Sequence, residues 1–199
     1  MIHKLEDMCA NHNFDKSEAI GILSQIDINQ EFDSIEGSWD TLLLESAITH
    51  TNTAMVKLLL ESGADPNIVF DTDESPLWNL QYNYGKTYEE NEQRLIIAQL
   101  ILEYGANPNI NPENGPENLF EFVLYTVFND NFDELWTYRI RFFILLVAYG
   151  GKSDYCKPKI IKPFDKTNMK QYKFHLKSYN NGMYGGVICD SKKNIVAYI

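Results

Sequence analysis

The stretch that decides the fold is VKLLLESGADPNI, residues 56–68. Its apolar residues recur at helical spacing, and Gly63 follows the last turn. Glycine takes the left-handed backbone conformation that ends many helices, and the proline and asparagine after it favour a turn. The stretch therefore predicts a helix that stops at Gly63 and leads straight into a turn.

A similar segment, ILEYGANPNI, occurs at residues 101–110, and a more divergent copy, LLVAYGG, occurs at residues 145–151. Residues 27–29 also echo residues 65–67. Repetition at about 40 residues is typical of stacked helical hairpins. The sequence therefore predicts a mainly α-helical solenoid of about four repeats.

The unit at residues 39–68 is the most regular. We expect its first helix to start within residues 39–47 and its second to cover residues 53–60. This unit resembles the ankyrin repeat, whose first helix opens with Thr-Pro-Leu-His-x-Ala-Ala and whose second is followed by Gly-Ala-Asp. Residues 41, 43, 47 and 63–65 match that pattern, whereas residues 42, 44 and 46 depart from it.

The neighbouring units keep less of the pattern. In the next unit, residues 75–78, Ser-Pro-Leu-Trp, correspond to the Thr-Pro-Leu-His pattern that opens the first helix. In the third unit, only Leu119 matches that pattern. Residues 1–30 predict a degenerate hairpin that caps the stack, with Asp15 capping its second helix and Glu18 three residues later. The resemblance covers about residues 15–151 and implies an ankyrin-like domain over residues 1–151.

Two insertions lengthen the later units. They occupy residues 82–92 and 125–138, between the two helices of their units, and both are rich in aromatic and acidic residues. We expect them to lie side by side at one edge of the stack.

A different pattern follows Gly151. Lys-Pro pairs at 157–158 and 162–163 indicate an extended linker, since residues before proline avoid the helical conformation. Polar and apolar residues then alternate at 172–179, and turn signals at 180–182 and 190–193 precede two further strand-like segments. Residues 152–199 therefore predict a linker and a small β-hairpin or meander, which either caps the stack or contacts a partner.

Charge is unevenly distributed along the 199 residues, whose net charge is −11. Residues 1–149 hold 7 Lys and Arg against 25 Asp and Glu, a net of −18, whereas residues 150–199 hold 10 Lys against 3 Asp, a net of +7. An acidic body repels nucleic acid and favours a basic protein partner. The lysines of the tail are spread rather than clustered, which favours a solvated face over nucleic-acid binding.

The cysteines and the hydropathy bear on the cellular compartment. Cys9, Cys156 and Cys189 are odd in number and far apart, which is typical of reduced thiols in a cytoplasmic protein. The N-terminus shows no signal-peptide pattern, and no apolar run approaches the roughly 18 residues that span a bilayer. We expect a soluble protein without membrane contact.

Catalytic and cofactor motifs are weak. Gly85, Lys86 and Thr87 end like a phosphate-binding loop but lack its upstream glycine, and residues 71–74 lack the glycine and final glutamate of a calcium loop. One cysteine and two histidines near the N-terminus fall short of the four ligands of a structural zinc site. The sequence predicts no cofactor, no metal and no enzyme activity.

In ankyrin proteins, the loops between repeats form β-hairpin fingers that line a concave binding face. The resemblance places such fingers at about residues 29–40, 67–75 and 109–118, and all their charged residues are acidic. The predicted partner-binding residues are the carboxylates Glu31, Asp33, Glu36, Asp40, Asp71, Asp73, Glu74, Glu113 and Glu117 and the aromatic residues Trp39, Phe70 and Trp78. Hydrophilic loops in an acidic protein, and packing of Trp39 and Trp78 between units, are the simpler explanations.

The expected function is therefore binding of another protein, with a basic one favoured by charge. A small acidic ankyrin protein resembles bacterial immunity proteins, which neutralise a cognate toxin. A general adaptor or effector scaffold is the alternative. An enzyme using His175 and Cys189 in the tail is the least favoured, and the fold alone decides none of these.

Overall fold

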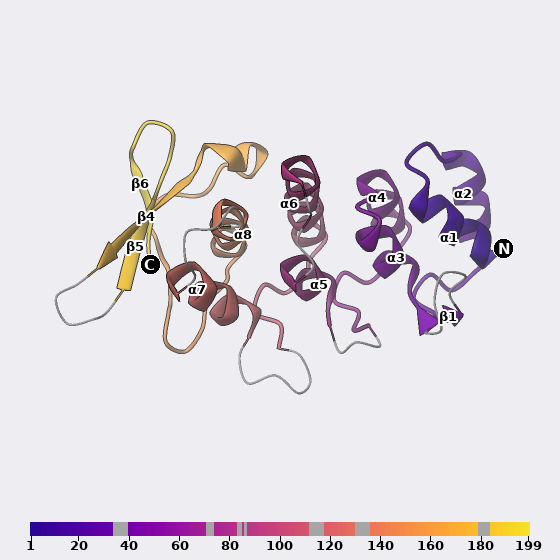
Figure 1. Ribbon diagram of the computed structural model, residues 1–199, viewed down its shortest axis with the longest axis horizontal. Helices are drawn as coiled ribbons and strands as arrows, with labels where there is room; N and C mark the ends of the chain where they lie inside the picture. Colours follow the sequence, from indigo (N-terminus) through magenta and orange to yellow (C-terminus); the bar gives the residue numbers. More distant parts are fainter. Residues whose placement is uncertain are drawn as a thin grey trace. The chain divides into compact units, whose positions relative to one another are not determined.

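The computed structural model describes residues 1–33, 40–70, 74–82, 85, 87–111, 118–129, 136–178 and 184–199 (Figure 1). These residues are mostly helical, with a short hairpin near the N-terminus and an antiparallel sheet near the C-terminus. The chain divides into two compact units, Met1–Asn107 and Pro108–Ile199. The domain boundary predicted after residue 151 falls inside the second unit.

The helices of the first unit follow one another in pairs. They are α1 (Ile2–Ala10) with α2 (Lys16–Leu23), α3 (Leu43–Thr49) with α4 (Thr53–Glu61), and α5 (Pro76–Tyr82) with α6 (Tyr88–Glu103). The second helix of each pair begins after a residue whose side-chain oxygen accepts a backbone N–H, namely Asp15, Asn52 or Thr87. Such caps stabilise a helix by about 1 kcal/mol each, so local chemistry fixes where these helices begin.

Glycine ends the second helices of the later pairs, α4 and α6, as the sequence predicts. Gly63 and Gly105 have φ of 99° and 97°, a conformation that other residues rarely adopt. The N–H of Ala64 donates to the carbonyl of Leu59 at 3.0 Å, and that of Gly63 donates to Leu60 at 3.2 Å. This pair of bonds satisfies the last carbonyls of the helix. Equivalent bonds close α6 at Gly105 and the last helix of the second unit at Gly150.

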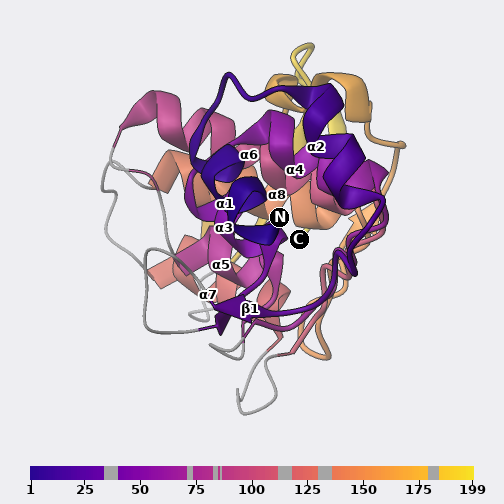
Figure 2. The same cartoon turned by 90° about the vertical axis from the view of Figure 1, so that its right-hand side faces the viewer.

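The three pairs of the first unit lie side by side. Helix α3 packs against both α1 and α5, and α4 packs against α6. Figure 2 looks along this row, where α1, α3 and α5 lie one behind another. The buried apolar side chains of the row include Leu5, Leu43, Ile48, Val56, Leu59 and Ile97. Because each fully buried side chain of this size contributes about 1.5–3 kcal/mol, contact between neighbouring pairs stabilises the unit.

Asparagines connect successive turns. Asn29 donates to the carbonyl of Gly63 at 3.3 Å and accepts from the N–H of Asp65 at 2.8 Å. Asn67 makes the same two bonds with Gly105 and Asn107. In the second unit, Asn109 makes them with Gly150 and Lys152. The similarity between residues 27–29 and residues 65–67 thus reflects the same pair of hydrogen bonds, made by an asparagine in each turn.

One buried asparagine holds the first two pairs together. Asn52 is fully buried and its amide nitrogen donates to the carbonyls of Met8, Cys9 and Asn11, at 3.0–3.2 Å. Its oxygen accepts from the N–H of Met55 at 3.1 Å. A single side chain therefore satisfies the end of α1 and the beginning of α4, where unpaired backbone groups would be costly.

The second unit combines a helix pair with a sheet. Helices α7 (Leu119–Asn129) and α8 (Trp136–Ala148) precede β3 (Lys159–Ile160), the 3-10 helix η1 (Lys166–Gln171), β4 (Lys173–Ser178), β5 (Tyr184–Cys189) and β6 (Ile195–Tyr198). The strands form an antiparallel sheet in the order β3-β6-β5-β4, which confirms the predicted β-meander. Phe174 of β4 contacts Phe128 and Phe143 edge-on, so aromatic packing joins the sheet to the helices.

Strand β3 was not predicted from the sequence. It lies at the edge of the sheet, within the stretch expected to be a linker, and both its residues are exposed. The pairs Lys157–Pro158 and Lys162–Pro163 flank it on both sides. The two prolines limit the strand to a short length, because proline cannot donate a ladder hydrogen bond.

Other boundaries also differ from the expectation. The first helix of the regular unit starts at Leu43, within the expected range, but Asp40 and Thr41 before it form strand β2, which was not predicted. The predicted insertions are largely helical where they are described: α6 starts at Tyr88 and α7 continues to Asn129. Glu18 is paired with Lys4 rather than with the cap residue Asp15. Residues 83–84, 86 and 130–135 of the insertions lie outside the described part.

Candidate protein-binding surface

The first predicted finger contains a short β-hairpin. Strand β1 (Phe32–Asp33) pairs antiparallel with β2 (Asp40–Thr41). Phe32 is buried and its ring meets the edge of the His3 ring on α1, with centroids 6.4 Å apart. An apolar anchor at the base therefore positions the exposed carboxylate of Asp33.

The backbone register of this hairpin pairs two aspartates. The register places Asp33 directly opposite Asp40. Side chains opposite each other in an antiparallel pair are close neighbours, and like charges there destabilise the hairpin. Glu31 is exposed just before the strand, and Glu45 of α3 accepts a hydrogen bond from the Thr41 hydroxyl at 3.0 Å. Both strands of the hairpin and the adjacent helix α3 thus contribute acidic residues to this region.

The second predicted finger is closed at its base. The N–H of Phe70 donates to the carbonyl of Glu74 at 2.8 Å. The carboxyl of Glu74 is half-buried, and this burial raises its pKa above the usual value for glutamate. A carboxylate that is partly withdrawn from water gains from an approaching cation, because the cation replaces lost hydration.

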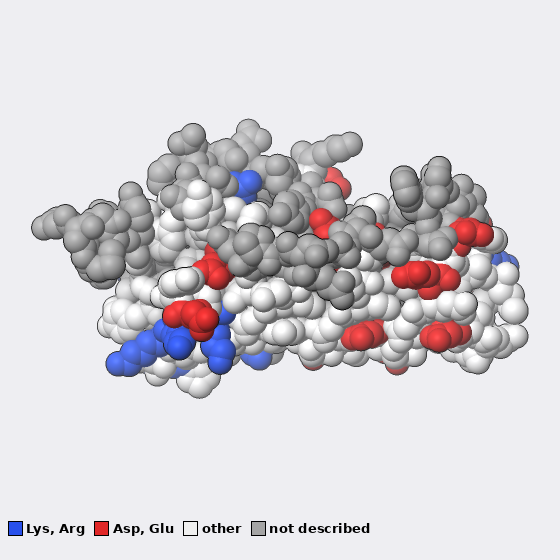
Figure 3. Space-filling model, turned by 90° about the horizontal axis from the view of Figure 1, so that it is seen from below, with Lys and Arg blue, Asp and Glu red and all other residues white. Residues whose placement is uncertain are grey.

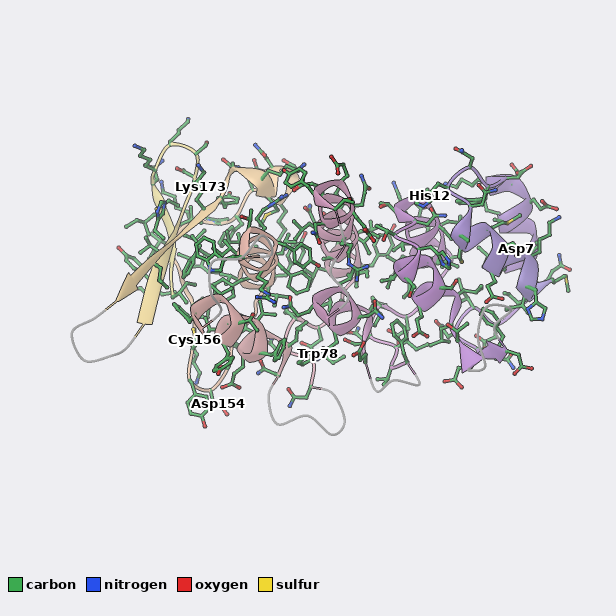
Figure 4. The ribbon with its side chains drawn as sticks, viewed as in Figure 1. Asp7, His12, Trp78, Asp154, Cys156 and Lys173 are labelled. Carbon is green, nitrogen blue, oxygen red and sulfur yellow. The ribbon has the colours of Figure 1, made fainter. Side chains whose placement is uncertain are left out.

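The aromatic residues of this finger point inward rather than to solvent. Phe70 and Trp78 are only 2% and 4% exposed, so neither ring is presented to solvent. Figure 4 labels Trp78, which lies on α5. The burial of Trp78 agrees with the simpler explanation that this residue packs inside the protein. The ring of Phe70 is likewise not exposed to a partner. Carboxylates rather than aromatic anchors remain as candidate contacts in the described fingers.

The other predicted residues lie largely outside the described part of the chain. These are Glu36, Trp39, Asp71, Asp73, Glu113 and Glu117. The third finger belongs to the second unit, where the N–H of Leu119 donates to the carbonyl of Ile110 at 3.0 Å and closes its base. The side chain of Asp40 also lies outside the described part. We use "finger surface" below for Glu31, Asp33 and Glu74 of the first unit.

The first unit is acidic as a whole. Residues 1–107 hold 5 Lys and Arg against 19 Asp and Glu, a net of −14. Figure 3 shows the finger side, where acidic patches are spread over the described surface of this unit and basic atoms show only at its rim. A field of one sign attracts oppositely charged partners and speeds their association.

The remaining reactive side chains are poorly placed for chemistry. Cys9 is fully buried, and burial raises its pKa to about 12. Burial also raises the pKa of Cys156, although this residue is partly exposed. Over the described ranges, no cluster of three or more His, Cys, Asp or Glu residues could hold a metal ion. In the same ranges, no helix is both long and apolar enough to cross a bilayer.

Comparison with known families identifies one segment. Residues 39–70 match the family model described as Ankyrin repeat. This segment is similar to an ankyrin repeat. It contains β2, α3, α4 and the Gly63 turn, and thus the ankyrin-like pattern that is most regular in the sequence. Ankyrin repeats are interaction modules, which supports a protein-binding role. No curated protein matches the chain.

Sequence reasoning missed several residues of this region. Glu45 adds a carboxylate next to the hairpin, and Asn52 fixes the turn between α3 and α4. Asn52 could have been found from the sequence, because an asparagine directly before an apolar helix is typical of an N-cap. The Asp33–Asp40 pairing had no such signal, because the register of a hairpin depends on a loop conformation that spacing alone does not fix.

Proposed function

We propose that this protein binds a basic protein partner through the finger surface of its ankyrin-like unit. The observation that carries the proposal is the backbone register of the first finger, which pairs the exposed Asp33 with a second aspartate, Asp40, in a unit whose net charge is −14. A structural role does not account for this pair, because it opposes formation of the hairpin. A lysine or arginine of a partner that approaches the exposed Asp33 offsets the negative charge of this strand pair.

The test exploits opposite effects on stability and binding. Asp33→Lys replaces the repulsive pair by an attractive one, so the hairpin should gain stability by about 0.2–1 kcal/mol. Binding of a basic peptide such as decalysine should weaken and lose part of its salt dependence, because one carboxylate has become a cation. Asp7→Lys is the matched control, since Asp7 is exposed on α1 and the change in charge is identical.

Calorimetry with decalysine at two salt concentrations measures binding, and thermal melting measures stability. An Asp33→Lys variant that binds as tightly as Asp7→Lys would show that only the overall charge matters. A specific surface instead predicts a larger loss for Asp33→Lys, by about tenfold if one charge-assisted contact disappears.

The most concrete version of the function is an immunity protein that inhibits a basic toxin. The net charge of the first unit, the small size and the resemblance to an ankyrin repeat support it. A co-expression experiment with the product of the adjacent gene separates this version from an adaptor. An immunity protein abolishes the toxicity of its partner, whereas an adaptor binds without changing the partner's activity.

A further inference from the structure

The sheet of the second unit has two unlike edges. Its strand order is β3-β6-β5-β4, so β3 and β4 each pair with only one neighbour among the described strands (Figure 1). Strand β3 has two residues with a proline on either side, whereas β4 has six residues and contains no proline. An edge strand of that length presents a row of backbone groups with which another strand can pair.

The register shows which backbone groups of β4 point outward. Gly186 of β5 exchanges two hydrogen bonds with Ile199, at 2.9 and 3.3 Å, and it lies opposite Leu176 of β4. A residue in an antiparallel ladder directs its N–H and C=O to one neighbour only, so Gly186 does not bond to Leu176. The N–H and C=O of Leu176 therefore point away from β5, and neither has a hydrogen-bond partner among the described residues.

The two faces of β4 differ in chemistry. Phe174 is buried and its ring contacts aromatic rings of α7 and α8, so this face of the strand lies against the helices. Leu176 shares that face but is 37% exposed. Because side chains alternate along a strand, Lys173 and His175 lie on the opposite face, where both are exposed. Figure 4 labels Lys173 at the start of β4.

The charge of the sheet favours one kind of added strand. Its four strands contain three lysines and no Asp or Glu, within a segment, residues 150–199, whose net charge is +7. Two copies of β4 paired antiparallel about His175 would set residue 173 of each against residue 177 of the other, lysine against lysine. Like charges opposite each other destabilise a strand pair, whereas opposite charges stabilise it. An acidic strand is therefore favoured over a second copy.

Lysines on an edge strand also have a simpler explanation, since they discourage unwanted pairing with other chains. Protected edges are short, bulged or interrupted by proline, as β3 is. Strand β4 instead keeps an unbroken register with β5 from Lys173 to Ser178. The irregularity of the sheet lies between β5 and β6, away from the outer edge of β4. Protection alone therefore does not explain why this edge stays long and regular.

We propose that the β4 edge binds an extended acidic segment of a partner protein, which adds to the sheet as a further strand. The segment pairs with the outward N–H and C=O of Leu176, and its acidic residues lie beside Lys173 and His175. Backbone hydrogen bonds supply affinity in this mode of binding, and alternate side chains supply selectivity. The surface shares no residue with the finger surface and takes a segment of opposite charge, so neither proposal depends on the other.

Amide hydrogen exchange provides the measurement. The full-length protein is titrated with a short peptide that alternates glutamate and valine, and NMR follows the exchange of individual N–H groups. The N–H of Leu176 should gain protection in a saturable way, because it acquires an acceptor. The N–H of His175 points toward β5 and should be protected from the start. Saturable binding without added protection at Leu176, or no binding at all, contradicts the proposal.

A matched pair of variants separates the β4 edge from general charge. Lys173→Glu should weaken peptide binding by about fivefold or more, because an attractive cross-strand pair becomes repulsive. Lys159→Glu makes the same change at the first residue of the opposite edge strand, where the lysine is also exposed, and should bind like the wild type. Equal losses in the two variants would reduce the effect to net charge and overturn the site.

Proline tests the backbone contact itself. Leu176→Pro removes an N–H that makes no bond to β5, so the fold should persist while peptide binding is lost. A folded Leu176→Pro variant that binds as well as the wild type contradicts the proposal. A peptide in which the central valine is replaced by proline makes the complementary test on the unaltered protein. It keeps the charge of the probe but should bind much more weakly, and equal binding of the two peptides contradicts strand addition.

Two controls identify the occupant of the edge. A peptide that alternates lysine and valine should not bind, and binding as tight as that of the glutamate peptide would contradict selection by charge. Sedimentation without peptide should show no dimer that protects the N–H of Leu176, since such a dimer would mean that a second copy occupies the edge. Asp33→Lys should leave binding of the glutamate peptide unchanged, so failure of the finger surface and failure of the β4 edge are observed in different experiments.

Discussion

The side-chain oxygen of Asn67 accepts a hydrogen bond from the backbone N–H of Asn107 at 2.7 Å, across 40 residues of sequence. The amide nitrogen of the same side chain donates to the carbonyl of Gly105 at 3.2 Å. One asparagine thus connects the turn after α4 with the turn after α6. The bonds of Asn29 connect the preceding turns in the same way.

Asn67→Ala should destabilise the first unit by about 1–3 kcal/mol, because it leaves a carbonyl and an N–H without their partner. Asn67→Asp keeps the oxygen that accepts from Asn107 but loses the donor to Gly105, so its effect should be intermediate. Urea denaturation followed by circular dichroism measures both. Asn13→Ala is the control, since the exposed Asn13 side chain makes no such connection. Equal stability of Asn67→Ala and Asn13→Ala would contradict the prediction.

Gly63→Ala and Gly21→Ala should change stability in opposite directions. A Cβ at either glycine meets no heavy atom within 4 Å, so only the backbone conformation distinguishes them. At Gly63, φ is 99° and alanine should cost about 1–2 kcal/mol. Gly21 lies within helix α2, where alanine should stabilise by about 0.5–1 kcal/mol. Melting temperatures that move in the same direction would disprove this explanation of the repeated glycine.

Asn52→Ala should be among the most damaging single changes in the first unit. It removes the cap of α4 and leaves the carbonyls at the end of α1 unpaired, with an expected loss of about 2–4 kcal/mol. Asn52→Asp retains the cap oxygen and should lose less at the α4 end while burying a charge near the α1 carbonyls. Hydrogen exchange at α1 and α4 resolves the two effects. Protection lost only at α4 in Asn52→Ala would rule out the link to α1.

Cys9 should make stability fall at alkaline pH. Burial raises its folded-state pKa from 9.0 to about 12, so the folded protein keeps the thiol proton that the unfolded chain releases. The contribution is complete below about pH 9 and is lost progressively between pH 9 and 12, by at most about 1.4 kcal/mol per pH unit. Cys9→Ala should remove this part of the slope. Urea midpoints measured at pH 8 and pH 10 that fall equally in both proteins would contradict it.

The repeating architecture could be predicted because local chemistry specifies it. Each copy of the phrase contains an apolar helix, a glycine that ends it and a turn, and the structure shows that arrangement at Gly63, Gly105 and Gly150. The cap at Asp15 and the strands of the tail were also correctly predicted for local reasons. Signals that act over a few residues can be recognised in the sequence without knowledge of tertiary contacts.

The candidate site was less predictable, because it depends on contacts between distant segments. Phe70 and Trp78 are buried by neighbouring helices, which spacing along the chain cannot reveal. His12 and Glu89 line one surface pocket, although no motif connects these two residues. The secondary structure of the two insertions was not predicted from the sequence, and their described residues are largely helical.

The short strand β3 bears on how the protein behaves when it is concentrated. An exposed sheet edge can template the addition of further chains and so start aggregation or fibre growth. Here the edge offers only two residues, proline interrupts it on both sides, and the adjacent lysines make two such edges repel each other. The β3 edge of the sheet is therefore poorly suited to strand-by-strand polymerisation.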